Sequence, residues 1–179
     1  MKRLVGFTML SLGLALGCTA HAQSVRASAT IQSCSDKPVS GKLELVERDS
    51  PEGVKVVEVK LSVKGLSDGK HAVHIHEAGV CTPCGDAKGH FDPGPAGKSA
   101  PDGNHPYHSG DLINIEVKNG EGRMETLTSR VTLSPGPLSL FDADGSSVII
   151  HTEADSYCPE GEVKGCAGGA RAACGVIDR

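Results

Sequence analysis

The sequence has few aromatic residues: 2 Tyr, 3 Phe and no Trp in 179 residues. It also lacks a block of Lys or Arg, and its formal net charge is −4, so nothing in its charge suggests a nucleic-acid partner. With 38% hydrophobic and 22% charged residues, the chain is neither disordered nor embedded in a membrane. The sequence is rich, by contrast, in His and Cys, with 8 and 7 residues, and this points to metal and disulfide chemistry.

The apolar run near the N-terminus is too short and too interrupted by Gly to span a bilayer. It covers Leu4–Leu16, follows the basic start Met1-Lys2-Arg3, and precedes Ala20-His21-Ala22, a small-x-small cleavage pattern. This arrangement predicts a signal peptide at residues 1–22 and one mature domain at residues 23–179. We therefore expect a periplasmic or secreted protein without a membrane span.

Cys18 offers an alternative, because the residues before it loosely fit a lipobox and would make it a lipid-anchored first residue. The cleavage pattern after it is the better match. Cleavage would leave an even number of cysteines, as an oxidised framework in an exported protein requires. These are Cys34, Cys81, Cys84, Cys158, Cys166 and Cys174. Six cysteines allow about 15 pairings, and the spacing alone does not choose among them.

No window of helical length keeps a 3.6-residue period, whereas short segments alternate apolar and polar residues. The expected strands are Val25–Gln32, Lys42–Glu47, Val57–Lys64, His71–Glu77, Ile113–Lys118, Arg123–Leu133, Ser147–Thr152 and Ala172–Ile177. Turn signals such as Asn119-Gly120 separate them. Eight short strands in one domain predict an all-β antiparallel barrel or sandwich. Two long irregular segments, residues 78–110 and 153–169, interrupt the pattern, and loops of this length are usually functional.

Histidines gather where these strands end and the two loops begin. His74 and His76 alternate on one expected strand, so both rings point to the same face. The other candidates are His90, His105, His108, Asp111 and His151. Imidazole suits copper and zinc, and a carboxylate commonly completes a zinc site. An all-nitrogen set favours copper with redox work, whereas a set closed by Asp favours structural zinc.

Five segments, taken in this order, resemble the Cu/Zn superoxide dismutase family, and the resemblance extends from about Ser28 to Ile177. They are His71–Glu77, Gly89–Pro93, His108–Leu112, Ile150–Asp155 and Gly169–Val176. The resemblance implies an eight-stranded Greek-key β-barrel with two long functional loops, binding copper and zinc. It also implies that the protein converts superoxide to oxygen and hydrogen peroxide.

The resemblance further implies the ligands. Copper is expected at His74, His76, His90 and His151, and zinc at His90, His108, Asp111 and one further histidine, for which His105 is the only free candidate. His90 would bridge the two metals and pass a proton to the substrate. The family usually places its middle zinc histidine near the position of Lys98, so His105 is a departure from the pattern. Asp155 is expected to hydrogen-bond ligands of both metals, and His71 to brace the loop without binding metal.

The same resemblance assigns Arg171 to positioning of the anion and Lys164 to its electrostatic guidance, although Lys164 also fits a solvated loop face. It pairs Cys174 with Cys81 or Cys84. Cys158 is expected to pair with Cys166, and Cys34 with the remaining loop cysteine.

Two other functions fit the sequence less well than a dismutase. A non-catalytic copper-binding barrel would not need Arg171, and a zinc hydrolase would need an open zinc position that the Asp-closed set does not offer. The Cys-x-x-Cys at Cys81 and Cys84 lacks the βαβ context of a thioredoxin-like pair. A homodimer is compatible with the sequence, which does not set the oligomeric state.

Overall fold

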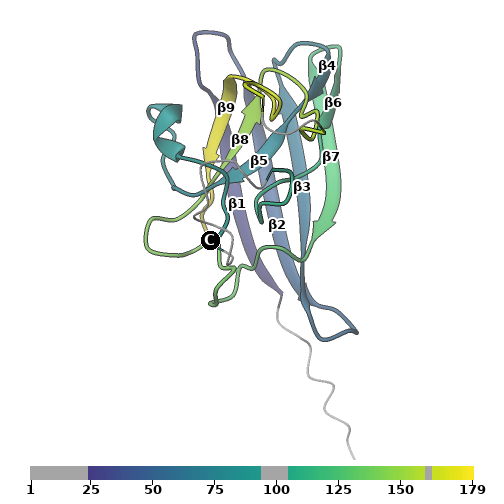
Figure 1. The fold of residues 1–179 in the computed structure, drawn as a ribbon, viewed down its shortest axis with the longest axis vertical. Helices are drawn as coiled ribbons and strands as arrows, with labels where there is room; N and C mark the ends of the chain where they lie inside the picture. Colours follow the sequence, from purple (N-terminus) through teal and green to yellow (C-terminus); the bar gives the residue numbers. More distant parts are fainter. Residues whose placement is uncertain (1–23, 94–104, 160–162) are drawn as a thin grey trace, which may run out of the picture.

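The computed structural model describes residues 24–93, 105–159 and 163–179, so the expected signal peptide, Cys18 and Lys98 lie outside the described residues. Nine strands form one antiparallel sheet in the order β4-β6-β7-β3-β2-β1-β9-β8-β5 (Figure 1). The strands are β1 (Val25–Ser33), β2 (Ser40–Asp49), β3 (Lys55–Lys64), β4 (Gly69–His71), β5 (Val73–His76), β6 (Ile115–Lys118), β7 (Glu121–Thr128), β8 (Ser147–His151) and β9 (Arg171–Val176). A short 3-10 helix, η1 (Cys84–Ala87), is the one helix among these residues.

The sheet curls into a nearly closed barrel because its two edge strands are consecutive in the chain. β4 ends at His71 and β5 begins at Val73, with Ala72 alone between them. The connections from β3 to β4 and from β7 to β8 pass across the barrel rather than to a neighbouring strand, as in Greek-key folds. The expected all-β barrel is confirmed, with nine strands instead of eight because the segment His71–Glu77 is divided.

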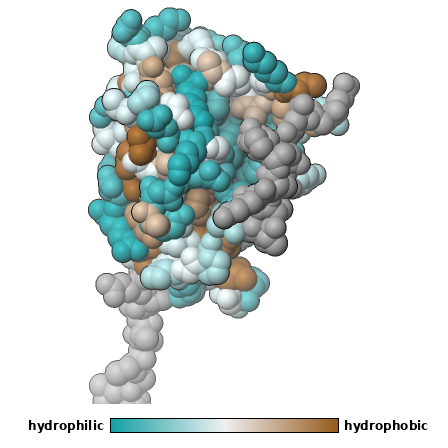
Figure 2. Space-filling model, turned by 60° about the vertical axis from the view of Figure 1, so that its left-hand side comes forward, coloured by the Kyte–Doolittle hydropathy of each residue, from teal (hydrophilic) through white to brown (hydrophobic). Residues whose placement is uncertain are grey.

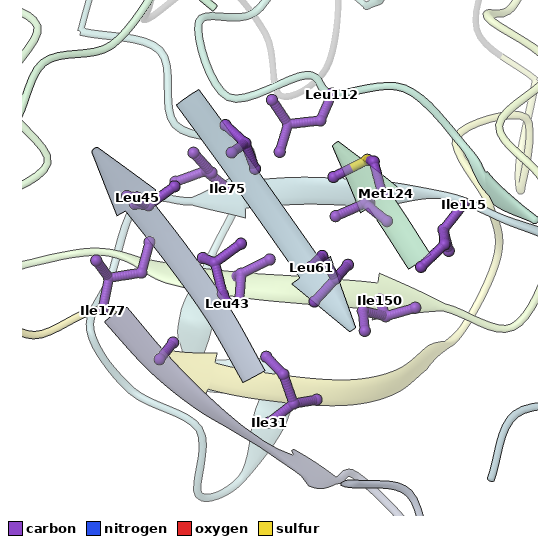
Figure 3. Packing of buried hydrophobic residues seen from close by; sticks show 14 of the residues in the cluster. Ile31, Leu43, Leu45, Leu61, Ile75, Leu112, Ile115, Met124, Ile150 and Ile177 are labelled. Carbon is purple, nitrogen blue, oxygen red and sulfur yellow. The ribbon is translucent and has the colours of Figure 1, made fainter. Parts of the chain in front are cut away.

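Aliphatic side chains fill the barrel (Figure 3). Leu43, Leu45 and Leu61 come from neighbouring strands, and Ile31 and Ile150 close the same cluster from β1 and β8. Phe91 is the one aromatic residue among the fully buried members of this cluster in the described chain. Burial of this apolar surface is the main stabilising contribution, and branched aliphatic side chains suit the pleated surface. The scarcity of aromatic residues therefore does not limit the core.

The hairpin between β6 and β7 follows the turn that the sequence predicts. Asn119 and Gly120 both have positive φ, 54° and 74°. Two consecutive residues with positive φ are typical of the type I′ turn, whose twist matches that of antiparallel strands. The expected strand Arg123–Leu133, however, ends at Thr128, and the chain continues as a loop.

That loop is fastened to the barrel by a buried carboxylate. Glu47 follows Leu43 and Leu45 on the inner face of β2 and is 1% exposed, although its charge predicts a place on the polar face of that strand. Its carboxylate accepts hydrogen bonds from the N–H groups of Leu133 and Ser134 and from the Ser134 hydroxyl. Burial opposes its ionisation, but these hydrogen bonds outweigh burial and lower the pKa of Glu47 below its ordinary value.

Glu47→Gln is expected to lower the free energy of unfolding by about 2 kcal/mol near neutral pH, because an amide cannot accept all three hydrogen bonds. The lowered pKa stabilises the fold above the ordinary carboxyl pKa of 4.5, and this stabilisation is lost as the pH falls through the folded-state value. Urea unfolding of the metal-free protein should therefore show a difference between variant and wild type that shrinks in acid. Glu44→Gln, an exposed change on the same strand, is the control and should leave the free energy of unfolding close to the wild-type value. Equal stability of Glu47→Gln and wild type at neutral pH would contradict this role.

The surface carries no extended apolar face in the view of Figure 2, where hydrophobic residues are scattered among hydrophilic ones. Within the described residues, none of the helical structure has the length and apolarity needed to cross a bilayer.

Candidate metal centre

Four buried histidines converge on one side of β5 and the end of β8. His74, His76, His90 and His151 each offer a ring nitrogen, and these four atoms lie within 4.8 Å of one another. Alternation along β5 puts His74 and His76 on this side, while Ile75 packs in the barrel core (Figure 3). His151 ends β8, next to a register irregularity in its pairing with β9.

Hydrogen bonds to backbone carbonyls determine which ring nitrogen of His76 and of His151 faces the centre of this group. Nδ1 of His76 donates to the Lys88 carbonyl at 3.0 Å, and Nδ1 of His151 donates to the Gly169 carbonyl at 3.1 Å. Nε2 of His76 is then left buried without a hydrogen-bond partner in the described structure. An orphaned ring nitrogen aimed at three other imidazoles is the arrangement that a metal ion satisfies. The donor set therefore fits copper, for which imidazole is a suitable ligand.

Burial favours the neutral, metal-binding form of His76 and His151. It lowers the pKa of His76 to about 2, and nearby His90 adds to the effect. Burial likewise lowers the pKa of His151 to about 3, with a further contribution from His74. Neutral imidazoles carry the lone pair that a metal requires, so protons compete weakly at these two positions.

A second group lies against the first and shares His90 with it. His74, His90, His105 and Asp111 bring ligand atoms within 4.8 Å of one another. Nδ1 of His90 is 2.7 Å from one Asp111 oxygen, and Nδ1 of His105 is 3.2 Å from the other. His108 stands outside this tight group, but its Nδ1 is 3.1 Å from Asp111 Oδ2. Three imidazoles around a buried carboxylate suit zinc.

The charges of this second group depend on each other. Burial favours the neutral acid, but hydrogen bonds from His105, His108 and His90 hold the pKa of Asp111 far below its ordinary value. Burial also disfavours protonated His105, yet its close contacts with the carboxylates of Asp111 and Asp155 raise the pKa of His105 to about 9. The raised pKa of His105 means that protons and a metal ion compete for this group of residues.

Asp155 connects the two groups. Its Oδ2 is 3.0 Å from Nε2 of His74, and its Oδ1 is 2.9 Å from Nε2 of His105. Both contacts leave the Nδ1 atoms of these rings to face the ligand groups. Asn114 holds the backbone of Asp155 from both sides: its Nδ2 donates to the Asp155 carbonyl at 2.9 Å, and its Oδ1 accepts from the Asp155 N–H at 2.8 Å.

His71 lies nearby but outside both groups. Its Nδ1 is 2.8 Å from the His151 carbonyl and its Nε2 is 2.9 Å from the Ser67 carbonyl. The ring thus ties β8 to the turn before β4 and has no nitrogen directed at the ligand groups.

A cleft of ≈ 480 Å³ opens over the histidines. His76, His90 and His151 lie at its floor, and Arg171 and Lys164 belong to its lining. The guanidinium of Arg171 donates to the carbonyls of Cys84, Gly85 and Lys88. The cleft thus brings the cationic residues Arg171 and Lys164 together with imidazoles, an arrangement suited to a small anion.

Three disulfides lie in and around the cleft. Cys81 is bonded to Cys174, so the structure selects Cys81 from the two alternatives that the sequence leaves open. Cys84 is bonded to Cys34, and Cys158 to Cys166.

Some residues of the site have no signal in the sequence. Asn114 lies at a polar position within the expected strand Ile113–Lys118, which in the structure begins only at Ile115 as β6, and Lys88 contributes its backbone carbonyl. Arg130 donates to the carbonyl of Asp111 from the loop after β7. Proximity to the zinc-type motif at His108–Leu112 is the one hint that could have singled out Asn114.

The barrel with its paired histidine groups defines a metalloprotein of the copper/zinc type, and comparisons with known proteins agree. The family model described as copper/zinc superoxide dismutase (SODC) matches residues 39–177. "Superoxide dismutase [Cu-Zn] 2" of Aquifex aeolicus is 38% identical over an alignment covering 99% of both chains. "Superoxide dismutase [Cu-Zn]" of Deinococcus radiodurans is 35% identical, covering 94% of this chain and 93% of the relative.

The solved structure titled "Crystal Structure Analysis of the clock protein EA4" superposes with a TM-score of 0.67 at 27% identity, covering 86% of this chain and 93% of that one. The chain belongs to the copper/zinc superoxide dismutase family. It is an oxidoreductase that acts on superoxide, with copper and zinc as its cofactors. The expectations for family, activity and cofactors are confirmed.

Proposed function

We propose that His74, His76, His90 and His151 hold the copper and that His90, His105, His108 and Asp111 hold the zinc. The observation that carries this assignment is that His90 belongs to both ligand groups and also lines the cleft. His74 belongs to both groups by distance as well, but its Nε2 is held by Asp155, so it has one nitrogen to offer, which we assign to copper. His108, next to Asp111, then completes the zinc set.

When bound, copper supplies the one-electron redox chemistry by which one superoxide becomes oxygen and a second, with two protons, becomes hydrogen peroxide. The chain's own residues bind the anion and move protons. Arg171 binds the anion beside the histidines, and Lys164 attracts it into the cleft of a chain whose net charge is −4. The ring nitrogen of His90 turned away from Asp111, Nε2, holds and delivers a proton, because Asp111 engages Nδ1.

Export, assembly and partners are parts of the same proposal. The three disulfides and the relatives in bacteria support a periplasmic or secreted protein, made with a signal peptide at residues 1–22. A soluble rather than lipid-anchored form follows from cleavage after Ala22.

We expect no nucleic-acid partner, since the charge balance is acidic. A homodimer is the assembly to test by sedimentation; exposed Ile113, Leu127 and Tyr157 around one hollow of ≈ 410 Å³ support it.

The test is to load the mature protein with copper and zinc and to measure metal content and superoxide decay together. We expect one copper and one zinc per chain and rapid decay that slows as salt is added. Protein that holds copper without accelerating decay would instead favour the non-catalytic copper-binding alternative.

Arg171→Gln is expected to slow superoxide decay by about 10-fold or more and to weaken its salt dependence, because a cation that lines the cleft with the histidines is removed. Copper content should stay at the wild-type level, since Arg171 belongs to neither ligand group. Arg171→Lys, which keeps the charge but not the planar donors, is the control and should retain the salt dependence. Pulse-radiolysis rates at several ionic strengths measure both effects; unchanged rates in Arg171→Gln would remove this residue from the proposal.

A further inference from the structure

The guanidinium of Arg171 rests on the backbone of one short segment. Nη1 donates to the carbonyls of Cys84 and Gly85, at 3.0 Å for the latter, and Nη2 donates to the Lys88 carbonyl. The Lys88 carbonyl also accepts the Nδ1–H of His76. Where the guanidinium lies in the cleft therefore depends on where this backbone lies.

This segment has little packing of its own. Thr82, Pro83, Gly85 and Asp86 are exposed, and Ala87 is the buried residue at its end. The helix η1 has four residues and no side-chain cap on its N-terminus. Exposed segments with few buried contacts open locally at a small cost in free energy. Packing alone is therefore a weak means of holding the carbonyls of Cys84 and Gly85 in place.

The disulfide between Cys34 and Cys84 supplies a covalent hold at the first of these carbonyls. Cys34 follows β1, and its N–H donates to the carbonyl of Ala172, the neighbour of Arg171, at 2.9 Å. A closed ring results: Arg171 is bonded to Ala172, Ala172 accepts from Cys34, Cys34 is bonded to Cys84, and Cys84 accepts from Arg171.

The other nearby disulfide does not close such a ring. This bond links Cys81, three residues before Cys84, to Cys174, which lies in β9 three residues after Arg171. The exposed residues Thr82 and Pro83 separate Cys81 from Cys84. Cys81–Cys174 thus anchors the segment as a whole, whereas Cys34–Cys84 acts at the carbonyls themselves.

We propose that the Cys34–Cys84 disulfide is a positioning element for Arg171, which sets the affinity of the cleft for a small monovalent anion. The proposal rests on the role of Arg171 proposed above. Without the bond, the carbonyls of Cys84 and Gly85 move, and the guanidinium keeps its charge but loses the fixed acceptors that aim it at the histidines. Because hydrogen bonds weaken steeply with distance and angle, a small displacement is enough to loosen the anion site.

The experiment uses the copper- and zinc-loaded protein and azide as the anion probe, followed by its optical titration. Replacing both cysteines, C34S/C84S, leaves no free thiol and is expected to weaken azide binding roughly 3- to 10-fold, the effect of losing about one net hydrogen bond. Metal content should match wild type. The salt dependence of superoxide decay should also match it, because the cationic charge remains, which separates positioning from loss of charge.

A double-mutant cycle with R171Q tests whether the disulfide acts through Arg171. If it does, C34S/C84S has no further effect on azide binding in the R171Q background. Additive effects, or wild-type azide affinity in C34S/C84S, overturn the proposal. If R171Q alone leaves azide binding unchanged, the assigned role of Arg171 fails instead, so the two failures are distinguishable.

Loss of stability is controlled separately. V63A removes buried volume in β3, which β2 and β1 separate from β9 in the sheet, and should lower thermal stability while azide affinity stays at the wild-type value. If C34S/C84S does not fold, C34A/C84A keeps the apolar surroundings of the pair. Selective reduction and alkylation of Cys34 and Cys84 in the wild-type protein, mapped by mass spectrometry, gives the same comparison without substitution.

Discussion

His151→Ala is expected to lose copper and to reduce superoxide decay by at least ~100-fold, more than the ~10–100-fold cost of changing an outer partner of a metal ligand. His151 belongs to the all-histidine group and not to the group around Asp111. Its ring is oriented by the Gly169 carbonyl, and alanine offers no nitrogen in its place. The measurement is metal content after dialysis against limiting chelator, together with the rate of superoxide decay.

The reciprocal variant supplies the control. His105→Ala should lose zinc and retain copper, because His105 belongs to the second group alone. His151→Ala should conversely retain zinc. If both variants lost both metals equally, or if His151→Ala kept one copper and its activity, the assignment of two separate ligand groups would be wrong.

Asp155→Asn is expected to weaken the binding of both metals by about 10- to 100-fold. The carboxylate accepts from Nε2 of His74 and from Nε2 of His105, whereas an amide presents an acceptor to one ring and a donor to the other. One of the two histidines must then change its tautomer or its orientation. Competition with a chelator of known affinity measures the loss for copper and zinc in turn.

Two further variants sharpen this result. Asn114→Ala leaves the carboxylate in place but removes both hydrogen bonds to the Asp155 backbone, so it should have the same effect in weaker form. Asp36→Asn, an exposed change in the loop after β1, should leave both affinities unchanged. Wild-type affinity for both metals in Asp155→Asn would show that the bridging carboxylate does not orient the ligands.

The sequence predicts the barrel well because alternation along each strand reflects burial directly. The burial of Leu43 and Leu45 follows from this alternation, and the Asn119-Gly120 turn follows from backbone sterics. Alternation also puts Glu47 on the same face as Leu43 and Leu45, although its charge suggests solvent. Its burial depends on N–H groups more than 80 residues away, at Leu133 and Ser134.

The site shows the same division between local and distant information. The His74 and His76 pair is a local pattern, and the structure brings it together with His90 and His151. His105 could be named as a candidate ligand from the sequence, but its closeness to Asp111 and Asp155 depends on the path of a long irregular loop. Likewise, cysteine spacing could not choose between Cys81 and Cys84, because the choice depends on which of them faces β9.

The most direct test of the two ligand groups is anomalous diffraction from crystals of the metal-loaded protein, recorded at the copper and zinc absorption edges. We predict copper among His74, His76, His90 and His151, zinc among His90, His105, His108 and Asp111, and the His90 ring between the two. Zinc bound without His105, or both metals in a single group, would contradict this assignment.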